Sequence, residues 1–152
     1  MTEVRRASPA DALDAGRLLH EFNAEFDEPA PEPAAIAEHL AEQISDGTTV
    51  VLLAGQGPDG VAALQISPEV VSGKLSAYLE ELYVVPARRG NGIGRALMDA
   101  AMKTARELGA TRIDLTTSDD DVAARSLYES LGFVNREKPP DGPLMFYYER
   151  EL

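Results

Sequence analysis

The sequence predicts an α/β (α+β) chain in which a mixed, mostly antiparallel sheet of about seven strands is flanked by about four helices. Three observations predict this class. Strand-like and helix-like patterns follow one another in the order β-α-α-β-β-β-α-β-α-β-β. Residues 48–67 are typical of an antiparallel hairpin, and residues 75–117 of a strand–helix–strand crossover with parallel strands. The length of 152 residues predicts a single domain over residues 1–152.

The N-terminal part predicts one short strand and two helices. The strand is expected from Val4 to Ala7, and Ser8-Pro9 then starts a helix, because Ser caps well and Pro suits the first helical position. The proline-rich stretch at residues 27–33 ends this helix. A second helix follows, with apolar residues four apart. The apolar faces comprise Leu13, Leu18, Leu19 and Phe22 in the first helix, and Ile36, Leu40 and Ile44 in the second.

The rest of the chain predicts six strands and two helices. Gly-rich and Pro-rich turns separate them. The helix over 93–108 has the clearest apolar face, and Gly109 ends it. The expected strands are 48–54, 61–67, 75–85, 112–117, 133–136 and 144–148, and the last helix is 122–131.

Composition excludes several classes of site. The chain has no Cys, which excludes disulfides, thiolate zinc sites and thiol catalysis. With only His20 and His39 as imidazole ligands, no metal is expected. The net charge of −12 argues against nucleic-acid binding. No run approaches the roughly 20 apolar residues of a membrane span, so we expect no membrane partner and a cytoplasmic location.

One basic segment stands out in this acidic chain. Residues 86–117 hold 6 basic and 3 acidic residues, and they include the glycine loop, residues 88–95, with the sequence RRGNGIGR. The loop lies between a predicted strand and a predicted helix. The first N–H groups of a helix lack partners within it and favour anions, and glycines let phosphate oxygens approach. The loop therefore predicts a pyrophosphate site. The alternative is a glycine-rich turn before a surface helix.

The loop matches neither a Walker motif nor a dinucleotide fingerprint, but it resembles the acetyl-CoA motif of the GNAT superfamily of N-acetyltransferases. That motif, [Q/R]-x-x-G-x-[G/A], is met by Arg89, Gly92 and Gly94. A second block, AARSLYESLGF at residues 123–133, is similar to the family signature A-x-x-L-Y-x-x-x-G-F. The two blocks occur in the family's order, and the resemblance covers about residues 75–135.

The resemblance implies a GNAT-like fold with a central β-α-β unit that binds acetyl-CoA as co-substrate. Strand backbone would pair with the pantetheine arm, and loop amides would hold the pyrophosphate. The implied cofactor-binding residues are Leu82, Tyr83, Val84, Arg89, Gly90, Asn91, Gly92, Ile93, Gly94, Arg95, Asp121 and Ala124. Asp121 departs from the family, since many members carry Asn at that position. A carboxylate tolerates nearby phosphate poorly, and Asp121 can instead cap the following helix.

The resemblance also implies catalytic residues. Tyr128 stands where many members place the tyrosine that protonates the leaving thiolate, although a core tyrosine is the alternative. Glu80 and Glu81 lie on the strand that would border the acetyl group, and either can serve as general base. The segment LEELYV resembles polyamine-type members, which favours Glu80. Adjacent strand residues face opposite ways, but a bulge, which the family has here, alters that parity.

The sequence leaves the acceptor open. In the family, acceptor residues lie around the first helices, where this chain has Asn23, Phe26, Asp27 and Glu28. The acidic pair would suit a cationic amine, or else it serves solubility. We therefore expect direct acetyl transfer to a small primary amine of polyamine, aminoglycoside or amino-acid type, by a homodimer. The alternatives are acetylation of a peptide or protein amine, and a non-catalytic acyl-CoA-binding sensor.

Overall fold

The computed structural model describes residues 2–152, which form two compact units, residues 2–113 and 114–152. Each unit is described by itself. The first unit contains β1 (Val4–Arg6), α1 (Ala12–Glu25), α2 (Pro33–Asp46), β2 (Thr49–Ala54), β3 (Gly60–Pro68), β4 (Leu75–Val84) and α3 (Ile93–Glu107). Two short 3₁₀ turns, η1 (Pro9–Asp11) and η2 (Pro86–Arg88), precede α1 and follow β4. β5 (Ala110–Leu115) runs across the boundary, and α4 (Val122–Ser130) belongs to the second unit.

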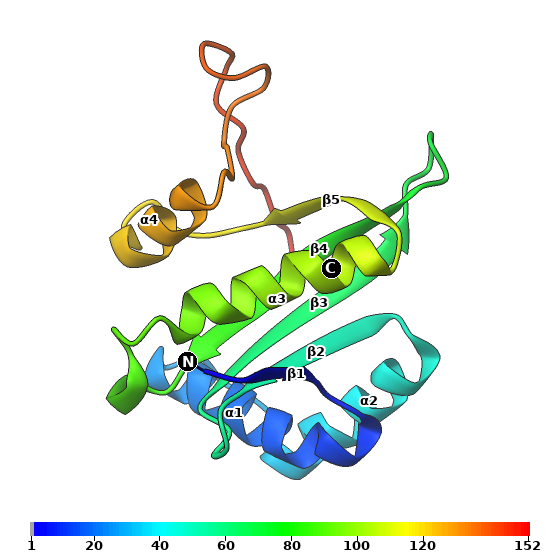
Figure 1. Cartoon of the computed structure of the whole chain (residues 1–152), viewed down its shortest axis with the longest axis vertical. Coiled ribbons are helices and arrows are strands. Elements are labelled where there is room, and N and C mark those ends of the chain that lie inside the picture. Colours follow the sequence, from blue (N-terminus) through cyan, green and yellow to red (C-terminus); the bar gives the residue numbers. More distant parts are fainter. Residues whose placement is uncertain (1) are drawn as a thin grey trace. The chain divides into compact units, whose positions relative to one another are not determined.

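The sheet has the strand order β1-β2-β3-β4-β5. Strands β1 to β4 pair antiparallel, whereas α3 connects β4 to β5 as the expected crossover (Figure 1). The α/β class and the mixed sheet are therefore confirmed, as are the four helices. The sheet has five strands among residues 2–152, however, and the expected number of seven is wrong.

The two missing strands are those expected at 133–136 and 144–148. Only an isolated bridge between Arg136 and Leu144 joins these segments. Their apolar side chains are largely exposed: Val134 by 60%, Phe146 by 73% and Tyr148 by 87%. An apolar run predicts a strand only when a neighbouring layer buries one of its faces, and these segments lack that cover.

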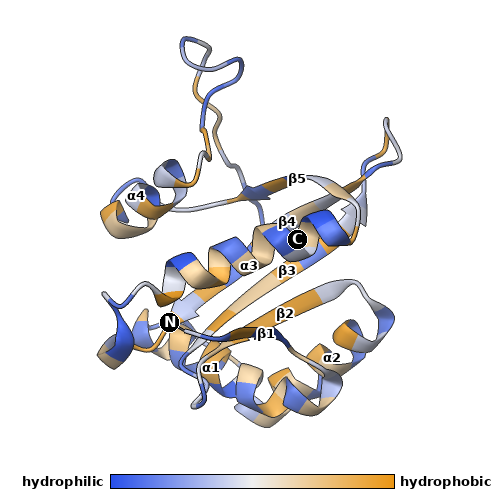
Figure 2. Cartoon of the chain, in the orientation of Figure 1, coloured by the Kyte–Doolittle hydropathy of each residue, from blue (hydrophilic) through white to orange (hydrophobic). Residues whose placement is uncertain are grey.

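The first unit has an apolar layer on each face of its sheet. On one face, α1 and α2 bury Leu18 and Leu40 against Val51 and Val61, among other residues. On the other face, α3 packs against β2, β3 and β4 (Figure 1). β2 and β3 are coloured mainly as hydrophobic in Figure 2, as expected of strands covered on both sides.

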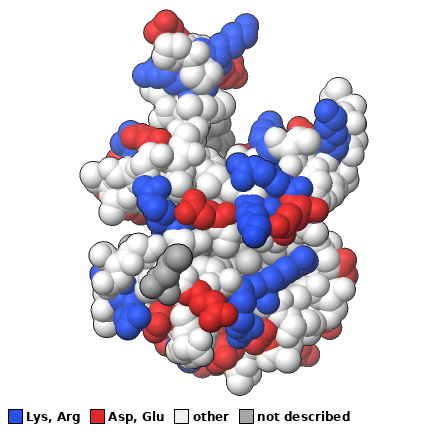
Figure 3. Space-filling model, viewed as in Figure 1, with Lys and Arg blue, Asp and Glu red and all other residues white. Residues whose placement is uncertain are grey.

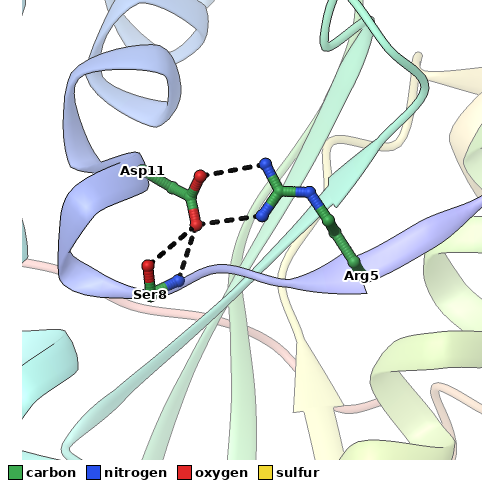
Figure 4. A network of polar contacts seen from close by, with 3 residues as sticks. All are labelled: Arg5, Ser8 and Asp11. Atoms are coloured by element: carbon green, nitrogen blue, oxygen red, sulfur yellow. Dashed lines mark hydrogen bonds and ion pairs between the residues drawn. The ribbon is translucent and has the colours of Figure 1, made fainter.

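A polar cluster holds the start of the first helix against β1. Figure 4 shows the Arg5 guanidinium donating two hydrogen bonds of 2.9 Å to Asp11, whose carboxylate also accepts from the Ser8 amide at 2.8 Å. These contacts, led by the one with Arg5, hold the pKa of Asp11 well below its usual range. The expected helix start at Ser8-Pro9 is confirmed, with a 3₁₀ turn before the α-helix proper.

Candidate active site

The glycine loop lies where strand β4 gives way to helix α3. Gly90 and Gly92 both have φ of +79°, a left-handed conformation that glycine adopts without strain. No atom lies within 4 Å of where a Cβ at either position would stand, so the loop presents open space there. The Asn91 side chain donates to the carbonyls of Arg88 and Arg89, at 3.0 and 3.3 Å, which stiffens the turn.

Helix α3 begins from this loop, with Gly92 as its N-cap. The Ala96 amide makes the first intrahelical bond, to the Gly92 carbonyl at 3.0 Å. The amides of Ile93 and Gly94 stand in the first turn of α3, where amides have no acceptor within the helix. Such a terminus favours a phosphate group. The loop therefore has the backbone shape that the sequence predicts for a pyrophosphate site.

Two arginines of the loop are held by acidic residues from elsewhere in the first unit. The Arg89 guanidinium donates to Glu25, the last residue of α1, at 2.8 Å, and its Nε donates to the Val84 carbonyl at 2.9 Å. Arg88 lies 3.7 Å from Asp59 in the β2–β3 turn. On the face in Figure 3, blue and red side chains likewise lie interspersed. Sequence reasoning missed Glu25, because no local pattern links residues 64 positions apart.

A β-bulge on β4 determines where the two candidate bases point. Ala63 of β3 stands opposite Glu81, but the next residue, Leu64, stands opposite Leu79, so Glu80 is the extra residue. Cross-strand partners project to the same side of a sheet. Leu79 therefore projects to the side of Leu64, while Glu81 projects to the side of Ala63, whose core contacts are with α1 and α2.

Glu80 turns to that same side of the sheet. Its carboxylate accepts a 2.7 Å hydrogen bond from the Gln65 side-chain amide. The side-chain oxygen of Gln65 in turn accepts from the buried Thr49 hydroxyl at 3.2 Å, and the same hydroxyl lies 3.0 Å from the side-chain oxygen of Gln43 on α2. The bulge therefore places two adjacent carboxylates on one face, whereas a regular strand would separate them. Gln65 was not anticipated, since its role depends on strand register.

The two carboxylates differ in their surroundings. Glu80 is exposed, whereas Glu81 is half-buried. Burial, and secondarily the charge of Glu80, raises the pKa of Glu81 to about 7. A carboxylate with that pKa exchanges protons near neutral pH, which suits a general base. The surroundings therefore favour Glu81 as the base, whereas the resemblance to polyamine-type members favoured Glu80.

The expected acceptor residues lie at the end of α1 and in the turn after it. Phe26 is 59% exposed, with its ring edge-on to Phe22 at 5.5 Å. Asp27, at φ +54°, and Glu28 are exposed. The Asn23 side-chain amide donates to the Leu19 carbonyl at 2.8 Å, which leaves its oxygen and its second N–H for other contacts. The candidate bases, the glycine loop and the end of α1 thus all belong to the first unit.

The other expected residues lie in the second unit. Tyr128 on α4 is 9% exposed and packs near Phe133, with 5.9 Å between ring centres. Burial, together with the charge of Asp121, raises the pKa of Tyr128, so the phenol keeps its proton at neutral pH. Asp121 caps α4 by accepting from the Ala124 amide at 3.1 Å. These contacts describe the second unit alone.

Residues 2–152 contain no candidate metal-binding cluster and no candidate membrane span. In this range no three His, Asp or Glu side chains are grouped as they would be around a metal ion. None of the helices in the same range has the length and apolar character needed to cross a membrane.

Comparison with known proteins supports the motif assignments. A model of the acetyltransferase (GNAT) family matches residues 16–133. The aminoglycoside N(6')-acetyltransferase type 1 of Stenotrophomonas maltophilia is 29% identical over 139 residues, covering 89% of this chain and 88% of that protein. The thialysine N-epsilon-acetyltransferase of Caenorhabditis elegans is 26% identical over 138 residues, covering 90% and 85%. A solved structure of a provisionally named acetyltransferase from Arthrobacter sp. FB24 superimposes with a TM-score of 0.89 at 40% identity, covering 99% and 96%.

Proposed function

The chain belongs to the GNAT family of acetyltransferases, and we propose that it transfers an acetyl group from acetyl-CoA to the primary amine of a small molecule. The observation that carries this proposal is the continuity of strand, loop and helix from Glu80 to Arg95. The bulged strand β4 holds the Glu81 carboxylate, whose pKa is about 7. This strand leads, through the short turn η2, into an open glycine loop at the N-terminus of α3.

The glycine loop supports the assignment of the acyl donor. Its left-handed glycines and the first amides of α3 suit a pyrophosphate group. We assign the pyrophosphate of acetyl-CoA to the amides of residues 90–95, and the pantetheine arm to the backbone of Leu82, Tyr83 and Val84. The donor supplies an activated thioester. Arg89 acts by holding the loop, since its guanidinium already contacts Glu25 and Val84. Asp121 and Ala124 stay predicted cofactor contacts.

Proton transfer is assigned to Glu81 and Tyr128. The amine nitrogen forms the new C–N bond to the thioester carbon, and the Glu81 carboxylate accepts the proton that the nitrogen must lose. The C–S bond then breaks, and the Tyr128 hydroxyl donates a proton to the departing thiolate. A phenol is protonated at neutral pH, as a proton donor must be, and burial raises the pKa of Tyr128 further, which makes it a weaker acid. No Cys is present for an acyl-enzyme, so direct attack in a ternary complex is the simplest route.

The acceptor is assigned from the turn after α1. Exposed Phe26, Asp27 and Glu28 offer an aromatic surface next to two carboxylates, and Asn23 lies one turn earlier. This set suits a small cationic amine. The names of two relatives, an aminoglycoside and a thialysine acetyltransferase, support the same class of acceptor.

The proposal is tested by measuring CoA thiol release from acetyl-CoA over polyamines, aminoglycosides, amino acids and short peptides. The protein has no Cys and adds no thiol background. Release with one small-amine class, well above the hydrolysis rate, supports the proposal. Release with peptides alone supports peptide acetylation instead. CoA binding without release over the panel supports a sensor.

Tyr128→Phe provides the catalytic control in the same assay. Loss of the phenolic proton is expected to lower kcat about 10- to 100-fold, with little change in the KM for acetyl-CoA. Equal kcat for Tyr128→Phe and the wild type would remove Tyr128 from the mechanism.

We further propose that the enzyme is a cytoplasmic homodimer. The family resemblance supports a dimer, and the run of exposed apolar side chains from Leu144 to Tyr148 is available for such an interface. Light scattering coupled to size-exclusion chromatography measures the oligomeric state directly. A monomer at micromolar concentration would contradict it.

A further inference from the structure

Glu25 lies outside every motif, yet its carboxylate is the partner of the motif arginine of the glycine loop. Arg89 Nη2 donates to both Glu25 oxygens, at 2.8 and 2.9 Å. The Arg89 Nε–H donates to the Val84 carbonyl at 2.9 Å. The guanidinium is thereby fixed on two sides, by the end of helix α1 and by the end of strand β4.

An aromatic group completes this contact. The Arg89 guanidinium carbon lies 5.6 Å from the centre of the Tyr83 ring, and the Tyr83 hydroxyl donates to Glu25 at 3.3 Å. The other neighbour of the Tyr83 ring is Phe22, stacked at 5.0 Å one turn before Glu25. Tyr83 itself is buried in the core between the sheet and helices α1 and α2. Glu25 and Arg89 are therefore held by a rigid support.

We propose that Glu25 is a positioning residue that holds the glycine loop, through Arg89, in the shape that binds acetyl-CoA. The inference rests on the proposed function, because it takes the loop as the acetyl-CoA site. An Arg that is held on two sides fixes the backbone at residue 89, one residue before the first left-handed glycine. Loss of Glu25 would free that end of the loop, and the amides of Gly90 to Gly94 would no longer be preorganised.

The position of Glu25 adds a second consequence. It ends α1, and the proposed acceptor turn begins at the next residue, Phe26. The acceptor turn and the glycine loop thus share one ionic contact. The neighbouring pair on the loop, Arg88 and Asp59, is longer at 3.7 Å and reaches the β2–β3 turn instead. Glu25 is therefore the acidic residue that connects the acceptor side with the loop.

The test compares Glu25→Gln with Glu21→Gln. Glu21 lies one turn earlier on the same helix and pairs with Arg17 at 3.1 Å, so it matches the charge change without an ion pair to the loop. CoA binding is measured by titration calorimetry, and steady-state constants are measured with the best amine. We expect Glu25→Gln to raise the Kd of CoA and the KM for acetyl-CoA about 5- to 30-fold, with kcat within about threefold of the wild type. Glu21→Gln should change neither.

A readout that needs no ligand separates this inference from the proposed function. Amide hydrogen exchange over residues 89–94 should be faster in Glu25→Gln than in the wild type, and unchanged in Glu21→Gln. Failure of the wild type to bind CoA would contradict the proposed function, and hydrogen exchange would still decide on Glu25. Unchanged exchange together with CoA binding within twofold of the wild type would overturn the role of Glu25.

Two further variants keep the test decisive. If Glu25→Gln does not fold, Glu25→Asp retains the charge with a shorter reach. Its Kd for CoA should lie between that of the wild type and that of Arg89→Gln. The double variant Glu25→Gln/Arg89→Gln should bind CoA no more weakly than Arg89→Gln alone, because the two residues act as one unit. Tighter CoA binding by Glu25→Gln would mean that Glu25 withholds Arg89 from the ligand, which overturns the proposal.

Discussion

At the scale of single residues, Glu80 and Glu81 show how surroundings separate two identical side chains. Both carboxylates reach the same side of the sheet because of the bulge. Glu80 is exposed and accepts a hydrogen bond from Gln65, whereas Glu81 is half-buried and its pKa is raised to about 7. The resemblance of the LEELYV segment to polyamine-type members favoured Glu80. Desolvation selects Glu81 as the residue able to give and take a proton near neutral pH.

Removal of the Glu81 carboxylate is expected to abolish the acid limb of the pH profile. A general base works only when deprotonated, so kcat/KM of the wild type should rise with pH through an apparent pKa near 7. Glu81→Gln should lose about 10²- to 10³-fold in kcat/KM and the limb with it. The measurement is the pH–rate profile from pH 5.5 to 9, corrected for the titration of the amine.

Glu80→Gln is the matched control for that profile. Removing the charge of Glu80 takes away one cause of the raised pKa of Glu81. The acid limb should persist and move to lower pH, with kcat at its plateau nearly unchanged. A limb that disappears in Glu80→Gln and survives in Glu81→Gln would reverse the assignment of the base.

At the scale of elements, helix α3 depends on glycine where it begins. Gly92 is in the left-handed region with open space around it, so a side chain there costs backbone strain without a clash. Gly73, in the β3–β4 turn, has φ of +70° and the same open surroundings. Substitution at either position should therefore lower the stability of the fold by a similar amount. Gly92 belongs to the proposed pyrophosphate loop, whereas Gly73 does not.

Gly92→Ala and Gly73→Ala should lose similar stability, about 1 kcal/mol, but differ in ligand binding. Gly92→Ala places a methyl group where a phosphate oxygen is expected to approach, and it should weaken CoA binding at least tenfold. Gly73→Ala should bind as the wild type does. Chemical denaturation and titration calorimetry on both variants make the comparison. Equal CoA affinity in the two variants would exclude the glycine loop as the pyrophosphate site.

The start of the first helix is a second element whose stability depends on one residue. Asp11 joins β1 to the helix through Arg5 and Ser8 (Figure 4). Its pKa is lowered in the folded chain, so its contribution is complete above its ordinary pKa and is lost as the pH falls below about 4. Because the pair with Arg5 is partly exposed, we expect a contribution of only about 1 kcal/mol.

Asp11→Ala is therefore expected to lower Tm by about 2–4 °C at pH 7, and by less at pH 3. Glu42→Gln, at an exposed position on α2, is the control and should leave Tm nearly unchanged at both values. Thermal unfolding followed by circular dichroism measures both. A Tm difference for Asp11→Ala that grows toward pH 3 would contradict the sign of the shift.

At the scale of the whole molecule, the charge of −12 bears on the acceptor. An acidic protein attracts cationic amines over several ångströms, and salt screens that attraction. Raising the salt from about 20 to 300 mM should increase the KM several-fold for a polyamine and less for a singly charged amine. Steady-state kinetics at constant pH measure this difference. A KM for polyamines that is independent of salt would show that the acidic surface does not attract the acceptor.

Much of this molecule could be predicted from sequence because its signals are local. Periodic apolar residues located α3, and glycines located the loop. The five-stranded sheet could not be counted correctly, since the segments around Val134 and Phe146 are apolar but uncovered. The bulge at Glu80 and the pair of Glu25 with Arg89 arise from strand register and from a contact 64 residues apart. Neither leaves a pattern within a short window of sequence.

The bulge also has a genetic consequence. Deleting the single codon for Glu80 would leave Leu79, Glu81, Leu82 and Tyr83 alternating regularly, each on the face that it now occupies. Glu80 is therefore an inserted residue, which the sheet accommodates without moving the residues on either side of it. A lineage can gain or lose a second carboxylate beside Glu81 in one mutational event, while the strand pairs on either side of the bulge keep their register.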